Sequence, residues 1–326
     1  MAGILTAVAP LQAAIQITRS TDATALATAL VGGAGAGITV TSALIQSPGT
    51  GASGEKSSGV YQITASPDTY GLTKGGIVLS TGDAGDDGTA SNTTPCEGFS
   101  DCLSFDFHDS ASAAEDTLLD QVCSGTHKDV TELDLTFNVA ADVSSLTLYV
   151  AFASDEYPTF NDSASLVDCF ALFVNGTDSA HNFANANGDV FTVANPGFGA
   201  WSGTQLNGAL LANNGVSTVP RIGLTIPVTP GSTGNALKLI LSDKLDGSID
   251  SAIYIEALGA SPPVGSDCVF CDGFEGSNLA CWSSQTGGSG GGSCLPWSPA
   301  TLLLAPSREL PWDHRLPANL RVVPRN

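Results

Sequence analysis

The sequence predicts an all-β fold: an antiparallel β-sandwich, jelly-roll-like, with one short N-terminal helix and an irregular C-terminal tail. Only 13% of the 326 residues are charged, and the polarity comes from Ser, Thr, Asn and Gly, a composition that disfavours solvent-facing helices. Short apolar segments alternate with polar residues at period two, and Gly, Asn and Asp turns separate them. Many short strands without helical segments between them indicate sheets packed face to face, not a parallel α/β fold.

The single helix is expected near the N-terminus. Thr21 or Asp22 can cap its first turn, and Leu26 and Leu30 share one of its faces. The glycine-rich segment 32–37 then ends it. That segment has the glycines of a nucleotide-binding loop, but such a loop follows a strand and opens a helix, whereas this one follows a helix. We therefore expect a connector there.

The strands follow in order along the chain. The expected strands cover residues 38–45, 133–139, 146–152, 170–174, 222–228, 237–241 and 253–258. Every second residue is apolar in 133–139 and 146–152, so each should place one face in the core and the other in water. Segment 170–174 is apolar on both faces and ends at the Asn175-Gly176 turn, which predicts a strand in the centre of a sheet.

Composition also predicts the domain organisation. Residues 1–14 are apolar and end in small residues, as expected for the remnant of a signal peptide; the alternative is a buried first strand. The sandwich is expected over residues 15–260, followed by a Cys- and Gly-rich linker over 261–293. Residues 294–326 form a basic Pro- and Arg-rich tail that we expect to be disordered. No segment has the roughly 18 consecutive apolar residues that a membrane-spanning helix needs.

Charge and cysteine content restrict the partners and the compartment. A net charge of −21 repels nucleic acid and anionic membranes and favours cations. Eight cysteines, mostly in loop-like surroundings, predict disulfides and an oxidising compartment, hence a secreted or cell-surface protein. A zinc site is the alternative, but only Cys268 and Cys271 have the C-x2-C spacing of zinc ligands.

Two acidic clusters predict a cation site. The candidate ligands are Asp155, Glu156, Asp162, Asp168, Asp243 and Asp250. The first four follow one expected strand, and the last two lie between the final two strands. Carboxylates at loop ends, near backbone carbonyls, supply the oxygen ligands that Ca²⁺ prefers. The alternative is that these acids are solvated loop residues or turn caps.

Catalytic motifs are not found in the sequence. It has neither the G-x-S-x-G motif of hydrolases nor the H-E-x-x-H motif of metalloproteases. A glycan hydrolase would need two carboxylates, such as Glu156 and Asp250, facing each other across an open cleft. The four histidines, in polar loop or tail segments, are expected to be surface residues: His108, His127, His181 and His314. We therefore expect a protein that is not an enzyme.

Several blocks of the chain resemble the bacterial choice-of-anchor L domain family. They are GIVLSTG at 76–82, FASDEYP at 152–158, DCFALFVNG at 168–176 and DSAIYIEA at 250–257. The resemblance spans about residues 20 to 260 and implies export, a β-rich fold and attachment or release outside the cell. The family has no established enzymatic activity, and the resemblance does not imply a ligand. Cys169 stands where the family has Val, which suggests that this cysteine is bridged. Residues 269–283 resemble a short motif, DGFEG followed by WS, near the ends of some exported bacterial proteins.

Together these features predict an extracellular or cell-surface β-sandwich module with a binding, adhesive or structural role, stabilised by Ca²⁺. Its ligand would be a glycan or a protein. Two alternatives stay open: a self-assembling subunit of an extracellular filament or matrix, and a secreted carboxylate-dependent glycan hydrolase.

Overall fold

A computed structural model of the chain describes residues 15–32, 37–48, 54–64, 70–85, 107, 109–160, 167–186, 188–200, 206–212, 219–245 and 247–261. The chain divides into two units, Met1–Pro263 and Val264–Asn326, and every described residue lies in the first. The expectations for the signal-peptide remnant at 1–14, for nearly all of the linker and for the tail at 294–326 lie outside the described residues.

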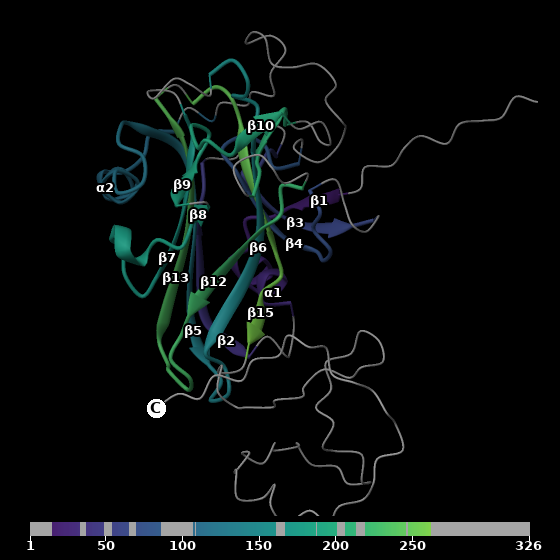
Figure 1. The fold of residues 1–326 in the computed structure, drawn as a ribbon, viewed down its shortest axis with the longest axis vertical. Helices are drawn as coiled ribbons and strands as arrows, with labels where there is room; N and C mark the ends of the chain where they lie inside the picture. Colours follow the sequence, from purple (N-terminus) through teal and green to yellow (C-terminus); the bar gives the residue numbers. More distant parts are fainter. Residues whose placement is uncertain are drawn as a thin grey trace, which may run out of the picture. The chain divides into compact units, whose positions relative to one another are not determined.

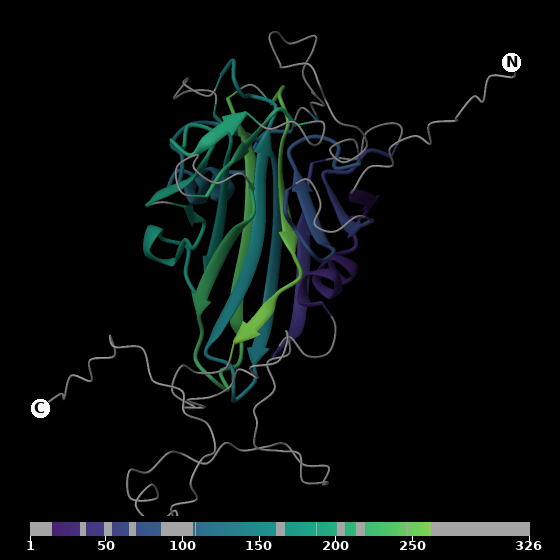
Figure 2. The same cartoon turned by 45° about the vertical axis from the view of Figure 1, so that its right-hand side comes forward.

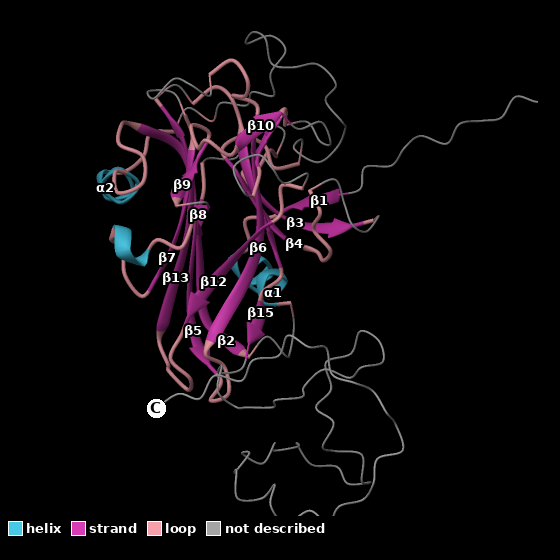
Figure 3. Cartoon of the chain, in the orientation of Figure 1, coloured by secondary structure: helices cyan, strands magenta, loops and turns pink. Residues whose placement is uncertain are grey.

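The described strands form two antiparallel sheets that lie as two layers (Figure 1). The nine-stranded sheet contains, in spatial order, β1 (Ile15–Arg19), β3 (Ser58–Ile63), β4 (Gly76–Ser80), β14 (Ser251–Glu256), β6 (Ser145–Ser154), β11 (Gly208–Leu210) and β10 (Phe198–Ala200), with β12 (Ile222–Pro227) and β15 (Gly259–Ser261) also paired to β6. The six-stranded sheet contains β2 (Ile38–Gln46), β5 (His127–Val139), β13 (Asn235–Lys244), β7 (Cys169–Val174), β9 (Asp189–Thr192) and β8 (Asn185–Ala186). The predicted all-β sandwich is confirmed, and strands dominate the described residues (Figure 3).

Helix α1 (Ala23–Val31) is the predicted N-terminal helix. The Asp22 side chain caps it by accepting hydrogen bonds from two backbone N–H groups of its first turn, which contributes about 1 kcal/mol in comparable helices. Gly32 ends it in the left-handed conformation, at φ 68°. Leu26 and Leu30 are fully buried, and the helix contacts β2 of one sheet and β3 and β4 of the other (Figure 2). It therefore covers one side of the sandwich.

A second helix, α2 (Ala113–Leu119), corrects the expectation of a single helix. Ser112 and Glu115 form a reciprocal capping box at its start, and Leu118 and Leu119 bury its inner face. The S-x-x-E spacing was the available signal in the sequence. Because the helix is short and lies among Ser, Ala and Asp residues, this spacing did not lead to the prediction of a helix. A three-residue 3-10 turn, η1 (Ser179–His181), is the third helical segment among the described residues.

Three apolar clusters hold these layers together. The largest lies between the sheets and includes Phe137, Leu148, Phe152 and Phe170. A second covers the outer face of the nine-stranded sheet around β14, and a third lies under α2 on the outer face of the six-stranded sheet. Because both outer faces are partly covered, β7 and β14 are buried along their whole length. The prediction that segment 170–174 is a central strand is therefore confirmed.

Strands β5 and β13 form the longest described pairing, and an irregularity near its end matters for the site. Leu241 pairs with Thr131, but Asp243 pairs with Lys128, so β5 has one extra residue there. Asp129 lies in this bulge with φ 46°. Bulges of this kind redirect side chains at the ends of sheets.

Candidate metal centre

The candidate acids lie at one end of the sandwich, the end near β10 in Figure 1. Strands β6 and β13 end here, and β5, β7 and β14 begin here, because neighbouring strands in an antiparallel sheet run in opposite directions. Both sheets contribute residues. The two acidic clusters that are separate in sequence, at 155–168 and 243–250, are thereby brought together.

Five of the six predicted ligands are buried rather than solvated. The exposed fraction is 0% for Asp155 and 2% for Glu156. It is 1% for each of Asp168, Asp243 and Asp250. Asp162 lies outside the described residues. Acids at these positions are therefore not the solvated loop residues that the sequence left open as an alternative.

Asp155 and Glu156 hold the backbone in place. The Asp155 carboxylate accepts a hydrogen bond from the backbone N–H of Asn207 at 2.8 Å, and its own N–H donates to the Asp250 carbonyl at 3.0 Å. The Glu156 carboxylate accepts from the backbone N–H of Asp168 at 3.0 Å. These contacts fasten the end of β6 to the segments that precede β7 and β14, a structural role that the turn-cap alternative anticipated.

Asp168 is buried between the two sheets. One of its carboxylate oxygens accepts a hydrogen bond from the Ser251 hydroxyl at 2.6 Å, and the other accepts from the backbone N–H of Lys244 at 3.1 Å. Burial raises the pKa of Asp168 well above its ordinary value, and the negative charge of Glu156 raises it further. The Ser251 contact joins β14 of the nine-stranded sheet to the start of β7 in the six-stranded sheet.

Asp243 is the exceptional member of the cluster. Neither of its carboxylate oxygens has a hydrogen-bond partner of acceptable geometry among the described residues, although both are buried. Burial raises its pKa well above the ordinary value, followed by the negative charges of Asp168 and Asp250. A buried carboxylate without a partner is rare because its desolvation is not compensated.

Asp129 is a member that sequence reasoning missed. Its negative charge also raises the pKa of Asp243, so it belongs to the same cluster. Its carboxylate accepts hydrogen bonds from the backbone N–H groups of Phe107, at 3.3 Å, and Asp109, at 2.9 Å. The bulge in β5 redirects it, and a bulge is visible only once the register of β5 against β13 is known.

Asp250 lies against Gly82, two residues after the end of β4. A Cβ atom at Gly82 would collide with the Asp250 carboxylate, so only glycine fits beside it. Thr81 and Ser251 exchange two hydrogen bonds, from the Thr81 N–H to the Ser251 carbonyl at 2.9 Å and from the Ser251 N–H to the Thr81 hydroxyl at 3.0 Å. The Ser-Thr-Gly sequence after β4 therefore packs directly against the cluster.

Two other buried acids, Glu256 and Asp83, have cationic partners. Glu256 lies at the opposite end of β14, where it accepts hydrogen bonds from Thr73 and pairs with Arg221 at 3.2 Å. Asp83 forms an ion pair with Arg19 of β1. Both carboxylates are compensated by a cation, unlike Asp243.

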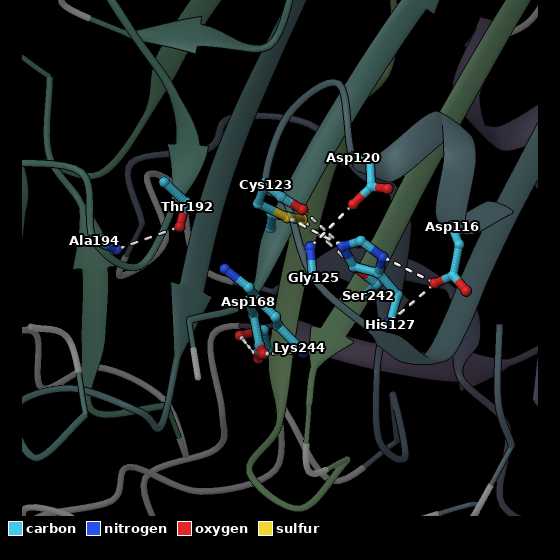
Figure 4. Close-up of a disulfide and its surroundings, with 12 residues drawn as sticks. Asp116, Asp120, Cys123, Gly125, His127, Asp168, Thr192, Ala194, Ser242 and Lys244 are labelled. Atoms are coloured by element: carbon cyan, nitrogen blue, oxygen red, sulfur yellow. Dashed lines mark hydrogen bonds and ion pairs between the residues drawn. A yellow bond between two sulfur atoms is a disulfide. The ribbon is translucent and has the colours of Figure 1, made fainter. Parts of the chain in front are cut away.

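His127 corrects the expectation that all four histidines are surface residues. It is fully buried, as the first residue of β5, and its Nδ1 lies 3.1 Å from a carboxylate oxygen of Asp116. Figure 4 shows it beside the disulfide that joins Cys123 to Cys169. Cys169 follows Asp168 directly, so this disulfide borders the acidic cluster. His181 is half-exposed, and His108 and His314 lie outside the described residues.

The four carboxylates of the cluster do not form a preassembled group of ligands, because among the described residues only Cys123, His127 and Cys169 have three ligand atoms within 4.8 Å of one another. Asp129, Asp168, Asp243 and Asp250 offer only oxygen atoms, which suit Ca²⁺ better than transition metals. A glycan hydrolase would require Glu156 and Asp250 to line an open cleft. Both side chains are buried instead.

Comparison with known proteins identifies the family. No helix in the described part of the chain is long and apolar enough to cross a membrane. Among curated proteins, none matches the sequence. One solved structure with some similarity is the carbohydrate-binding module TmCBM61 in complex with beta-1,4-galactotriose, with 8% identity and a TM-score of 0.24 over 68% of this chain and 90% of that chain. The model of the choice-of-anchor L domain matches residues 16–260. The chain therefore belongs to the choice-of-anchor L domain family.

Proposed function

We propose that this chain is a secreted or cell-surface β-sandwich module with a binding or structural role, and that Ca²⁺ stabilises one end of its sandwich. Family membership supports the location outside the cell. The observation that carries the calcium proposal is Asp243, a buried carboxylate that has no hydrogen bond of acceptable geometry among the described residues, although the Thr81 side chain lies close enough to lower its pKa.

The electrostatics of the cluster support a divalent cation. The negative charges of Asp168 and Asp250 raise the pKa of Asp243, and a contact with the Thr81 side chain lowers it by less. A group of buried carboxylates repels itself, and each protonates unless a cation compensates the charge. Ca²⁺ binding would remove this repulsion and supply the missing partner of Asp243.

A cation at this position would link the two layers. Asp243 lies near the end of β13 and Asp168 precedes β7, both in the six-stranded sheet, whereas Asp250 precedes β14 in the nine-stranded sheet. A Ca²⁺ ion bound by all three would fasten the sheets together at the end where the connecting loops leave them. Loops at the ends of a rigid sandwich are a common place for binding surfaces.

Thermal unfolding with and without calcium tests this proposal. The full chain is melted in EDTA, in Ca²⁺ and in Mg²⁺, and calorimetric titration gives the stoichiometry. We expect Ca²⁺ to raise the Tm and to bind at one ion per chain, with a smaller effect of Mg²⁺, which demands a near-ideal octahedral site. Equal melting temperatures in EDTA and Ca²⁺ would exclude the calcium role while leaving the fold and location unaffected.

The proposal assigns no reaction to this domain. Glu156 is held by the backbone N–H of Asp168, and Asp250 is enclosed by Gly82. Both would have to reach a sugar through the protein interior. Incubation with polysaccharides should therefore release no reducing sugar, and release that is lost in Glu156→Gln would overturn this assignment.

Self-assembly is a second candidate, favoured by strand β2. This strand is at the edge of the six-stranded sheet and, among the described strands, pairs only with β5. Leu44 on its outer face is 56% exposed, which is unusual for a large apolar side chain on a free edge. Sedimentation at increasing protein concentration tests it. Concentration-dependent association that Leu44→Lys removes would support assembly, and a monomer at every concentration would exclude it.

A further inference from the structure

A second metal-ligating group lies on the outer face of the six-stranded sheet, beside the acidic cluster but with different chemistry. Cys123, His127 and Cys169 each offer one ligand atom, and these atoms lie within 4.8 Å of one another (Figure 4). All three residues are buried, with exposed fractions of 8%, 0% and 0%. Two sulfurs and an imidazole suit Zn²⁺, whereas they are poor ligands for Ca²⁺.

We propose that Cys123, His127 and Cys169 form a Zn²⁺ site when the disulfide between the two cysteines is reduced. The oxidised and the reduced chain would then use the same two sulfurs in two ways: as a covalent link, and as thiolate ligands of a metal. This site is independent of the calcium proposal, because it shares no ligand with the acidic cluster.

The geometry of the imidazole supports this assignment. Its Nε2 lies 3.6 Å from Sγ of Cys123. In a tetrahedral zinc site with bond lengths of about 2.0 Å to nitrogen and 2.3 Å to sulfur, these two ligand atoms lie roughly 3.5 Å apart. Nε2 is therefore already at ligand distance from one sulfur. It now lies 2.8 Å from the backbone carbonyl of Cys123, which can only accept, so Nε2 carries a proton that zinc binding would have to displace.

A carboxylate holds the imidazole in the required orientation. Nδ1 of His127 lies 3.1 Å from Oδ1 of Asp116 on helix α2, and the same oxygen accepts the backbone N–H of His127 at 3.1 Å. Histidines that bind zinc usually donate their other ring N–H to a carboxylate in this way, which directs Nε2 toward the metal. Asp116 would therefore be a positioning residue and not a ligand.

The cysteines need only a local change. Their Cα atoms are 6.4 Å apart, and the two sulfurs would move to roughly 3.8 Å from each other around zinc, by rotation about the Cα–Cβ bonds. Two thiol molecules supply the two electrons and two protons that convert the disulfide into two thiols, and they leave joined as their own disulfide. Zn²⁺ then replaces the two thiol protons, which are released to solvent, and the Nε2 proton of His127, which passes to solvent or to Nδ1; a water molecule fills the fourth position.

Cobalt spectroscopy of the reduced chain tests this site, because Co²⁺ bound to thiolates has a charge-transfer band that oxygen ligands do not produce. The experiment uses the full chain with the other six cysteines replaced by serine, reduced by a phosphine in calcium-free buffer. We expect one Co²⁺ per chain with this band, displaced by Zn²⁺, and no band in the oxidised chain. Absence of the band after reduction would overturn the proposal.

Two aspartates of the same helical segment provide a matched comparison. Asp116→Asn should weaken metal binding about 10- to 100-fold, as expected when the partner of a ligating histidine is removed. Asp120→Asn should leave it unchanged, because the Asp120 carboxylate accepts the backbone N–H of Gly125 at 3.0 Å and not a proton of the His127 ring. Equal effects of the two substitutions would contradict the proposed role of His127. Both variants are also measured in the chain with all eight cysteines, in case the six serines impair folding.

Discussion

Replacing Asp243 by asparagine gives the sharpest test of the acidic cluster, because it removes the charge while nearly preserving the shape. In the absence of calcium, the Asp243 carboxylate is buried without a hydrogen bond of acceptable geometry among the described residues. An uncompensated buried charge costs about 3–5 kcal/mol, and an unsatisfied buried amide costs about 1–3 kcal/mol. We therefore expect Asp243→Asn to stabilise the calcium-free protein by about 2 kcal/mol. For a domain of this size, this raises the Tm by roughly 4–8 °C.

The response to calcium should change in the opposite direction. At a Ca²⁺ concentration about 100-fold above Kd, binding to the folded state alone stabilises the native chain by about 2.7 kcal/mol, or roughly 5–11 °C in Tm. Asp243→Asn should lose most of this shift, because it removes a charged ligand. The same substitution is thus expected to stabilise the protein without calcium and to prevent its further stabilisation by calcium.

Differential scanning calorimetry at pH 8, in EDTA and in Ca²⁺, measures both effects. Asp142→Asn is the matched control, since Asp142 is exposed in the turn between β5 and β6 and its replacement changes the net charge equally. A calcium shift in Asp243→Asn as large as in the native chain would refute the assignment of Asp243 as a ligand. A calcium-free variant less stable than the native chain would refute the inference that its charge is uncompensated.

Three further predictions follow from the same contacts. Gly82→Ala should reduce both the calcium shift and the Tm, because its methyl group would collide with the Asp250 carboxylate; unchanged values in calorimetry would contradict the packing. The apparent Ca²⁺ affinity should rise with pH, because burial raises the pKa of Asp243 and Ca²⁺ must displace its proton; equal titration curves at pH 5.5 and 8 would argue against this. Burial also raises the pKa of Glu132 from 4.5 to about 7. Because the folded state then holds this proton more tightly than the unfolded state, the contribution of Glu132 to the free energy of unfolding is fully present below pH 4.5. It decreases as the pH rises to about 7, by at most about 3 kcal/mol. Glu132→Gln should therefore flatten the stability profile in urea unfolding between these pH values, and a profile as steep as in the native chain would exclude the effect.

The strands and the first helix follow from local patterns in the sequence. Alternation from Leu133 to Val139 specified which face of β5 enters the core, because side chains of a strand point to opposite sides at period two. Asp22 and Gly32 marked the ends of α1, because capping depends only on residues within one turn. The family-like blocks likewise identified the segments at 76–82, 152–158 and 250–257 that meet around the acids.

The site depended on information that no single segment carries. The sequence predicted that Asp168, Asp243 and Asp250 share a cation, since each lies near the end of an expected strand. Their burial could not be predicted, because the pairing of β6, β7, β13 and β14 and the covered outer faces of both sheets decide it. Locally, such residues look like solvated turn acids.

Asp129 and His127, which the sequence did not place in a buried site, depend on tertiary contacts even more directly. Asp129 joins the cluster through a register shift between β5 and β13, and a register is a relation between two distant segments. His127 has polar neighbours in sequence, but helix α2 and Cys169 enclose it in space. Local sequence thus determined the strands, the first helix and the acidic character of the protein, because these depend on neighbours along the chain. Only the tertiary structure decided which charges are buried together without a partner, because burial depends on the packing of segments far apart in the sequence.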